Sequence, residues 1–462
     1  MTINNVIEEI SNSLSSESFL SIIDKKSNSL IECNSSLIPI FTKILSLSLN
    51  KPIIYINNSE DHCIDVLNWT KNLSTKTENI ILFPEKKKIS YKDSSHTERI
   101  KCISQLQTNN KNTIIISTLK SIFQTVPSPN YFNSQTKLIE VGDLIKLNDF
   151  SVDLIKMGFT HADHQVESPG EYTIRGGIID IFCINEKYPM RIELFGDSIN
   201  SIREFDQHTQ ISLNEIKKTN IKSFNYDQDS LIKNQGTILD HIGQDCLILL
   251  DNPNSIFKSL NENIEQLNNS KQSINNFITP EFKSYIYKFK TIEIFPWQTE
   301  NSISIEKIFN IKNIPELSGD SSNNQKSKIN LINDFQGQKI IQTSYINRTK
   351  ELFNKINQIQ IIETPPYKST PGFIYNSNKS SFILIGDKEL YGTKYISTID
   401  ETQRKEIIIN DEINPGDYIV HADHGIGKFI NFGKPPKSNS LQDYMIIEYA
   451  KSDKLYVPLT QI

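Results

Sequence analysis

The sequence predicts a multidomain α/β protein that ends in a small β-barrel. The chain has 462 residues, which is too long for one hydrophobic core and suggests roughly three domains. Short apolar runs alternate with helical stretches through much of the chain, a pattern typical of mostly parallel sheets. Residues 411–462 instead contain only short strands separated by turn residues.

The composition is that of an ordinary soluble protein. Apolar residues make up 37%, charged residues make up 22%, and the net charge is −5. The chain therefore lacks the global basic excess that drives phosphate binding in many DNA-binding domains. Nucleic acid could bind only at a local basic patch. The five cysteines are widely spaced without a C-x-x-C pair, which fits a reducing cytoplasm. We find no signal peptide and no apolar run of membrane-spanning length, so we expect a cytoplasmic protein without membrane contact.

The N-terminal part of the chain has the pattern of a parallel α/β unit. Apolar runs of the buried-strand kind occur at 51–57, 79–84 and 112–118. Helical stretches lie between them, at 61–73 and 96–107. This alternation predicts a mostly parallel sheet.

Residues 166–206 change to an antiparallel pattern. The stretches "EYTIRGGIIDIFCI" and "MRIELFGDSI" alternate apolar and polar residues, which predicts a hairpin with one solvated face. Arg191, Glu193 and Phe195 share the polar face, and Arg175 lies on the preceding strand. Arginine and aromatic residues are enriched at protein interfaces, but single exposed aromatics are also common. From these residues alone, an interface and an ordinary solvated face both remain open.

The middle of the chain returns to α/β texture. The stretch "DCLILLDNPNSIFKSLNENIEQL" within 236–320 predicts a strand, a turn and a helix. Residues 318–330 have the composition of a linker, and a charged linker occupies about 398–411. A further small α/β unit is expected between the linkers, with elements at 339–344, 346–356 and 381–390.

The C-terminal stretch predicts four short strands of a strongly bent barrel: "GDYIVHAD", "IGKFINF", "DYMIIEYA" and "KLYVPLTQ". Met445, Ile447 and Tyr449 share one face of the third strand, and its other face is also largely apolar. A small barrel buries only one face, so the spare face is interpreted as a docking surface or a strand edge open to a partner. The chain stops at Ile462 directly after a strand, so we expect the barrel to be truncated.

The stretch "VHADHGIGKF" (420–429) invites comparison with a phosphate loop. Such a loop needs G-x-x-x-x-G-K-[ST], but Ala422 stands in place of the first glycine and Phe429 in place of Ser or Thr. The nearest approach to a DExH box is "DETQ" (400–403), in the charged linker. We therefore expect no nucleotide site, and no G-x-S-x-G or other nucleophile motif suggests a catalytic residue.

The same stretch invites a metal-site interpretation, because His421 and His424 flank Asp423. The context alternates as strand, turn and strand, and no further ligands lie near in sequence. Zinc sites need three or four ligands, so we favour a turn histidine bonded to backbone. The second "HADH", at 161–164, is dismissed on the same grounds. No metal site is expected.

Two stretches resemble a known family. Residues 170–212, "GEYTIRGGIIDIFCINEKYPMRIELFGDSINSIREFDQHTQIS", resemble domain 2 of the bacterial transcription-repair coupling factors (Mfd) and, more distantly, of UvrB. "NPGDYIVHADHGIGKFINF" with "DYMIIEYAKSDKLYVPL" resembles their RNA-polymerase-interaction domain, a Tudor-like barrel shared with CarD. At 30–43, "LIECNSSLIPIFTK" stands where UvrB carries its Walker A and lacks Gly-Lys, a departure typical of the family. With its order and spacing, the resemblance covers nearly the whole chain.

The resemblance implies the N-terminal portion of such a factor: a degenerate P-loop-type UvrB-like module with an inserted α+β domain 2, a small connecting α/β domain and a truncated Tudor-like barrel. The implied divisions are UvrB-like domain 1a at 1–137, UvrA-binding domain 2 at 138–222, UvrB-like domain 1b at 223–317, the connecting domain at 318–397, a linker at 398–410 and the polymerase-interaction domain at 411–462.

The family's role implies a transcription-coupled nucleotide excision repair factor that recognises RNA polymerase stalled at DNA lesions and recruits UvrA. The matched positions place UvrA contacts at Arg175, Arg191 and Phe195, with Glu193 on the same face. They place a contact with the polymerase β subunit at Met445, whose strand neighbours Ile447 and Tyr449 share its face, and we expect strand addition through 443–450.

The family's ATP-driven translocase, with its ATP, Mg²⁺ and most of its contact with double-stranded DNA, is not represented in this sequence. We therefore expect a recruitment scaffold without a cofactor and without enzyme activity. One alternative is a UvrB-like or helicase fragment with ATPase activity, against which the missing P-loop and DExH box argue. Another is a CarD-like transcription regulator with an unrelated N-terminus, against which the domain 2 resemblance argues.

Overall fold

The computed structural model forms two compact units, Met1–Tyr395 and Ile396–Ile462, which we describe separately. The structure describes Ile7 and residues 29–73, 79–86, 94–108, 112–184, 186–223, 233–269, 282–299, 302–314, 322–354, 356, 358–364, 371–377, 380–391, 416, 418–421, 425–433, 444–449 and 453–458. None of the described helices combines the length and apolar character needed to cross a membrane.

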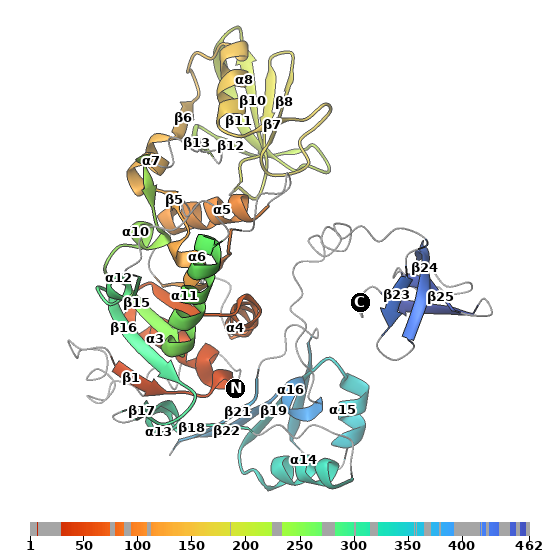
Figure 1. The fold of residues 1–462 in the computed structure, drawn as a ribbon. Coiled ribbons are helices and arrows are strands. Elements are labelled where there is room, and N and C mark those ends of the chain that lie inside the picture. Colours follow the sequence, from red (N-terminus) through yellow and green to blue (C-terminus); the bar gives the residue numbers. More distant parts are fainter. Residues whose placement is uncertain are drawn as a thin grey trace. The chain divides into compact units, whose positions relative to one another are not determined.

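A seven-stranded sheet, parallel throughout, forms the first part of the larger unit (Figure 1). Its strands, in spatial order, are β17 (Ile303–Ser304), β1 (Ser29–Glu32), β16 (Lys290–Phe295), β15 (Leu247–Asp251), β2 (Ile53–Asn57), β4 (Thr113–Thr118) and β3 (Asn79–Phe83). Strands β2, β4 and β15 are buried at every position, which explains their unbroken apolar runs. The predicted parallel sheet is confirmed, and strands from two distant stretches of the chain complete it.

Helices cover both faces of this sheet. The alternation of side chains along β2 sends Tyr55 into a core shared with α3 (Ile38–Leu49) and α4 (Glu60–Asn72). It sends Ile54 and Ile56 into a second core on the opposite face. The helices that contribute to this second core are α5 (Ser94–Thr108), α6 (Leu119–Phe123), α7 (Pro129–Ser134), α10 (Ile238–Ile242), α11 (Pro253–Asn269) and α12 (Phe282–Ile286).

Residues 136–222 form a separate sheet within the larger unit. Its order is β12 (Ser212–Ile216), β11 (Ser198–Phe205), β10 (Met190–Phe195), β9 (Ile178–Ile181), β8 (Glu171–Arg175) and β7 (Thr160–His161), with only β7 and β8 parallel. One face packs on α8 (Leu147–Lys156) through Phe150 and Leu154. The predicted antiparallel hairpin is confirmed. The chain enters on β6 (Thr136–Glu140) and leaves on β13 (Lys218–Lys222), and these two strands pair. The short strands β5 (Val126–Pro127) and β14 (Gln235–Gly236) pair nearer the parallel sheet.

A third sheet follows in the order β18 (Ile311–Asn313), β21 (Phe373–Asn376), β22 (Ser381–Ile385), β19 (Gln338–Thr343) and β20 (Ile359–Glu363). The helices of this part are α13 (Ile305–Phe309), α14 (Ser322–Asp334), α15 (Ile346–Leu352) and α16 (Asp387–Tyr391). The predicted linker at 318–330 is wrong where α14 occupies it. Ile329, Leu331 and Ile332 place an apolar stripe against the core in a mostly polar helix.

The described residues of the smaller unit form four antiparallel strands in chain order: β23 (Tyr418–His421), β24 (Gly425–Gly433), β25 (Tyr444–Glu448) and β26 (Lys454–Pro458). The four predicted strands are confirmed. Phe429 and Ile447 form the buried centre, with Tyr449 and Leu455 packed against them.

Candidate protein-interaction site

The face of the six-stranded sheet opposite α8 carries a hydrogen-bonded charge cluster. Ile179 and Ile181 lie in the α8 core, so Asp180 between them points to the other face. Its carboxylate is only 1% exposed. Arg175 donates to it from Nη2 at 2.7 Å, and Arg191 donates from Nε at 2.7 Å and from Nη2 at 2.9 Å. Asp180 therefore receives hydrogen bonds from arginines on two neighbouring strands.

Arg191 is held on several sides. Besides Asp180, it donates from Nη2 to Oε1 of Gln210 at 2.8 Å, and its guanidinium lies 4.3 Å from the ring centroid of Phe205. Its side chain is only 16% exposed. The hydrogen bonds to Asp180 raise the pKa of Arg191 above its ordinary value, so the guanidinium remains charged. These contacts show that Arg191 organises the cluster, with little surface left for a partner.

Glu193 is also engaged within the sheet. It forms an ion pair with Arg203 on β11, and Ser201 donates to its Oε2 at 3.0 Å. The Glu193 and Arg203 side chains are each about one-third exposed. The pair is electrically balanced and partly accessible, so it can orient a partner more than it can anchor one.

Two of the four predicted contact residues reach well into solvent. The side chain of Arg175 is 49% exposed, and Phe195 is 84% exposed. Phe195 ends β10 directly before a tight turn, where Gly196 has a φ of +63°, a conformation that favours glycine. The hairpin thus presents an aromatic ring that does not pack on its own fold.

The cluster has an excess of positive charge. Arg175 and Arg191 share the single carboxylate of Asp180, and the Glu193–Arg203 pair adds no net charge. Arg175 is the more exposed of the two cluster arginines, so the excess is accessible there. A partner carboxylate near Arg175 would complete the charge balance.

Sequence reasoning missed Asp180, Arg203 and Gln210. Asp180 had a usable signal, because a carboxylate between isoleucines in "IIDI" must lie on the face opposite the core. Arg203 had the same kind of signal in "SIREF". Gln210 lies in the turn between β11 and β12 with a φ of +60°, and nothing in its local sequence indicates the contact with Arg191.

In the smaller unit, two of the three predicted polymerase contacts pack in the core. Ile447 is 2% exposed and packs on Phe429, and Tyr449 packs against the same core. Strand β25 lies between β24 and β26, so both of its edges are already paired and strand addition through 443–450 is wrong. The side chain of Met445 lies outside the described part of the chain.

Exposed apolar side chains of this unit lie instead on β23 and β24. Tyr418 is 79% exposed and Ile426 is 68% exposed. Ile426 pairs with Val420, two residues beyond Tyr418, so Tyr418 and Ile426 share one face. Within the described strands, the free edges belong to β23 and β26.

The Gly-x-Gly-Lys stretch belongs to a packed strand. A Cβ atom added to Gly427 would overlap Cγ2 of Ile447 and lie 3.0 Å from the ring of Tyr449. Glycine is therefore required by close packing, and the stretch is part of β24 and not a loop around a phosphate. His424 and Asp423 lie outside the described residues, and His421 is described only by its backbone.

The parallel sheet has its own polar cluster at the carboxyl ends of β2 and β15. Asp251 accepts a hydrogen bond from the Tyr55 hydroxyl at 2.6 Å and from Nδ2 of Asn57 at 2.7 Å. His62 Nε2 lies 3.5 Å from the same carboxylate. Burial raises the pKa of Tyr55 well above its ordinary value, so the hydroxyl stays protonated and donates. Asp251 was not predicted as a site residue from the sequence, and "DETQ" (400–403) lies outside the described residues.

After β1, the side chain of Asn34 caps the turn that leads into α3. Oδ1 of Asn34 accepts from the Ser36 amide at 3.0 Å, and the Leu37 amide donates to the Asn34 carbonyl at 2.9 Å. These amides are thereby satisfied locally. Across the described residues, no three His, Cys, Asp or Glu side chains form a group arranged to hold a metal ion.

Two family models match parts of this chain. The model of the UvrB interaction domain matches residues 138–225, and the model of the CarD-like/TRCF RID domain matches residues 413–462. The transcription-repair-coupling factor of Bacillus subtilis is 24% identical over 92% of this chain and 43% of its own length. Those of Haemophilus influenzae and Borreliella burgdorferi are 23% and 27% identical, over 84% and 81% of this chain and 40% and 37% of their own lengths.

This chain is similar to the N-terminal portion of transcription-repair-coupling factors. It spans about two-fifths of the length of these relatives. The UvrB interaction domain match contains the whole charge cluster and Phe195. The CarD-like match contains β23 to β26, with Tyr418 and Ile426.

Proposed function

We propose that this chain is the recruitment part of a transcription-coupled nucleotide excision repair factor. In this proposal, the six-stranded sheet binds UvrA and the C-terminal unit binds the β subunit of RNA polymerase stalled at a lesion. The observation that carries the proposal is that the 84% exposed Phe195 and the half-exposed Arg175 lie on one face of the sheet, within the match to the UvrB interaction domain. The relatives are named transcription-repair-coupling factors, which agrees with this role.

The UvrA interface combines an apolar anchor with a charge that sets orientation. Burying the Phe195 ring supplies area, since a large aromatic side chain removes much apolar surface from water. Arg175 supplies a charge-assisted hydrogen bond to a carboxylate on the partner. Asp180, which Arg191 fixes from the other side, holds Arg175 in place, so little side-chain entropy is lost on binding.

The polymerase interface is proposed on β23 and β24. Tyr418 and Ile426 offer an exposed apolar pair, and the free edge of β23 offers unpaired main-chain groups for strand addition. Met445 remains a proposed contact through the resemblance. Ile447 and Tyr449 would then act indirectly, by supporting the sheet from its core.

We propose that this part of the chain acts without a cofactor and without catalysis. The Asn34-capped turn after β1 supports this, because its first amides are occupied by Asn34 and it has no Gly-Lys for a nucleotide phosphate. ATP-driven translocation and double-stranded DNA contact belong, in this proposal, to the remainder of the full-length factors. The same role implies that the protein is located in the cytoplasm.

Binding of purified UvrA from the same genome, measured by calorimetry, tests the recruitment role. The wild-type chain should bind, and a variant with both Arg175→Ala and Phe195→Ala should lose most of its affinity. Ile155→Ala, a 56% exposed site on α8, is the matched control and should bind as the wild type does. Equal binding by the double variant, with an unchanged melting temperature, would refute the assignment of this face.

ATP turnover in the presence of DNA tests the alternative of a UvrB-like or helicase enzyme. The scaffold role predicts turnover no higher than that of a protein-free control. Turnover that scales with protein concentration and disappears with the protein would overturn it.

A further inference from the structure

A row of three side chains crosses the tip of the β10–β11 hairpin. Phe195 pairs with Ser198 across the turn, and Leu144 forms an antiparallel bridge with Ser198 from its other side. Directly paired residues of antiparallel strands place their side chains on the same face. Leu144 therefore lies on the same face as Phe195, one strand position beyond Ser198.

Leu144 is nearly as exposed as Phe195. It is 81% exposed, whereas its neighbour Ile145 is buried in the core that α8 covers. Ile145 therefore packs in the core, whereas the Leu144 side chain remains exposed to solvent. A leucine and a phenylalanine, both more than 80% exposed on one face, form a surface suited to an apolar partner.

The backbone holds Leu144 in a fixed position. The amide of Gly142 donates to the Ile199 carbonyl at 2.8 Å, and the Ile199 amide donates to the Asp143 carbonyl at 2.8 Å. The Ile145 amide donates to the Asp197 carbonyl at 2.6 Å. These bonds fix the segment that carries Leu144 against β11, so a partner would find a preorganised surface.

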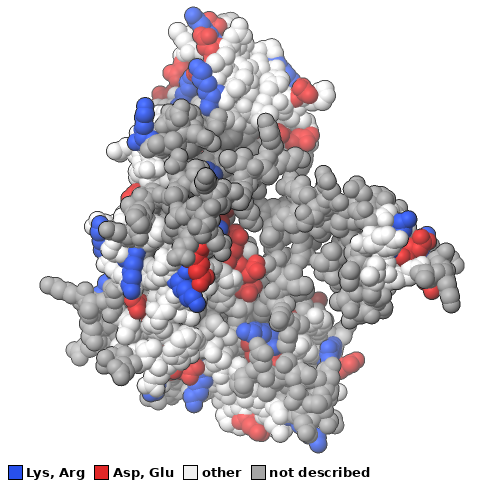
Figure 2. Space-filling model, viewed as in Figure 1, with Lys and Arg blue, Asp and Glu red and all other residues white. Residues whose placement is uncertain are grey.

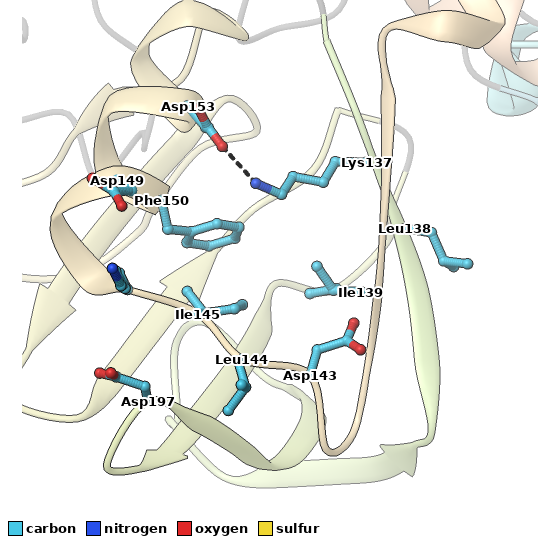
Figure 3. Close-up of a pocket in the computed structure, with 11 residues that line it drawn as sticks. Lys137, Leu138, Ile139, Asp143, Leu144, Ile145, Asp149, Phe150, Asp153 and Asp197 are labelled. Carbon is cyan, nitrogen blue, oxygen red and sulfur yellow. Dashed lines mark hydrogen bonds and ion pairs between the residues drawn. The ribbon is translucent and has the colours of Figure 1, made fainter.

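The two ends of this apolar surface carry opposite charges. Exposed Asp143 and Asp197 flank Leu144, as Figure 3 shows, and a hollow of about 510 Å³ opens beside them. Across the sheet, Arg175, Ile178 and Glu193 form the neighbouring row, with the excess positive charge at Arg175. The apolar row therefore lies next to an acidic end on one side and a basic end on the other.

We propose that the surface that binds UvrA continues past the hairpin tip, and that the partner buries Leu144 together with Phe195. This inference rests on the proposed function of the sheet. The matching surface on the partner then has an apolar centre, a basic group that faces Asp143 and Asp197, and a carboxylate that faces Arg175. Leu144 is then a second apolar anchor, and the two aspartates fix the direction in which the partner lies.

The test compares single variants of the full chain in binding to UvrA from the same genome. Leu144→Ala should weaken binding about tenfold, and Phe195→Ala should weaken it at least as much. Asp197→Lys should weaken binding and make the remaining affinity less sensitive to salt. Ile155→Ala, an exposed apolar residue on the helix covering the other face, should change affinity less than twofold. All variants should keep the wild-type melting temperature, since each changed side chain is exposed.

The outcomes distinguish UvrA binding by the six-stranded sheet from burial of Leu144 in that interface. If Phe195→Ala weakens binding and Leu144→Ala does not, the extension to Leu144 is wrong and the proposed function stands. If the wild-type chain does not bind UvrA, or if Arg175 and Phe195 are both dispensable, the proposed function fails and this inference fails with it. Loss of binding with Leu144→Ala, while Ile155→Ala binds normally, supports the extended surface.

Discussion

Arg191 donates two hydrogen bonds to Asp180, and the carboxylate that accepts them is almost completely shielded from water. Two parallel N–H···O bonds fix the guanidinium plane relative to the carboxylate. Arg175 shares the same acceptor from the neighbouring strand, so a single aspartate sets the positions of both arginines.

Asp180→Ala should strongly destabilise the six-stranded sheet. It would leave the largely buried Arg191 without its counter-charge, and removing one partner of a buried ion pair costs about 3–5 kcal/mol. Urea unfolding followed by circular dichroism would measure the loss. Asp197→Ala, in the exposed hairpin turn, is the control and should change stability by less than about 0.5 kcal/mol. An unchanged midpoint for Asp180→Ala would contradict the structural role of the cluster.

Phe195→Ala should separate binding from folding. The ring is 84% exposed, so its removal should change the free energy of unfolding by less than about 0.5 kcal/mol. UvrA affinity should fall by about 1–4 kcal/mol if the ring is a buried anchor in the complex. Arg191→Ala should instead lower both stability and affinity, because its side chain holds the cluster together. Calorimetric titration combined with thermal melts would distinguish the two patterns.

Gly427→Ala should destabilise the C-terminal unit. The added methyl group would overlap Ile447 and crowd the Tyr449 ring, and overpacking of this kind typically costs about 1–3 kcal/mol. Hydrogen exchange of the amides in β24 would report the change directly, without interference from the larger unit. Ile426→Ala, on the exposed side of the same strand, should leave exchange unchanged. Equal protection in Gly427→Ala and wild type would show that the strand does not approach its neighbours so closely.

Stability should fall as the pH is lowered through the range in which His241 titrates. Burial lowers the pKa of His241 below its ordinary value, and its Nε2 is bonded to the Pro127 carbonyl at 2.7 Å. Between the ordinary pKa of about 6.5 and the lower folded value, the unfolded chain binds a proton that the folded chain does not. The contribution is therefore complete above about pH 6.5 and declines as pH falls toward the folded pKa.

The His241→Gln variant isolates this effect, because glutamine keeps a donor for Pro127 and does not titrate. Its melting temperature should depend less on pH between 7 and 5 than that of the wild type, so the difference between the two should change steadily across that range. Parallel curves would show that His241 does not contribute to the acid sensitivity.

The sequence predicted the larger features of this fold because they rest on local periodicity. The buried runs in β2 and β4 and the alternation in β10 each determine which face a residue occupies. Charge pairing was not predictable in the same way. Arg191 and Glu193 were correctly placed on the polar face, but their partners Asp180 and Arg203 lie on neighbouring strands, and register decides such pairs.

The C-terminal unit shows a second limit of sequence reasoning. Both faces of β25 carry apolar residues, so alternation alone does not tell which face is the core. The close approach of Gly427 to Ile447 decides it, and that contact arises from the pairing of β24 with β25. The linker predicted at 318–330 failed for a related reason, because the few apolar residues of α14 suffice when a core is available to receive them.

The interleaving of the seven-stranded sheet dictates an order of events during synthesis. Among the described strands, β1 pairs only with β16 and β17, and β16 begins about 250 residues after β1 ends. At about 5–20 residues per second, the ribosome needs roughly 10–50 s to supply those neighbours. Residues 136–222, by contrast, contain every strand of their own sheet and can fold as soon as they emerge. The nascent chain can therefore complete its six-stranded sheet before β16 and β17, the neighbours of β1, have been synthesised.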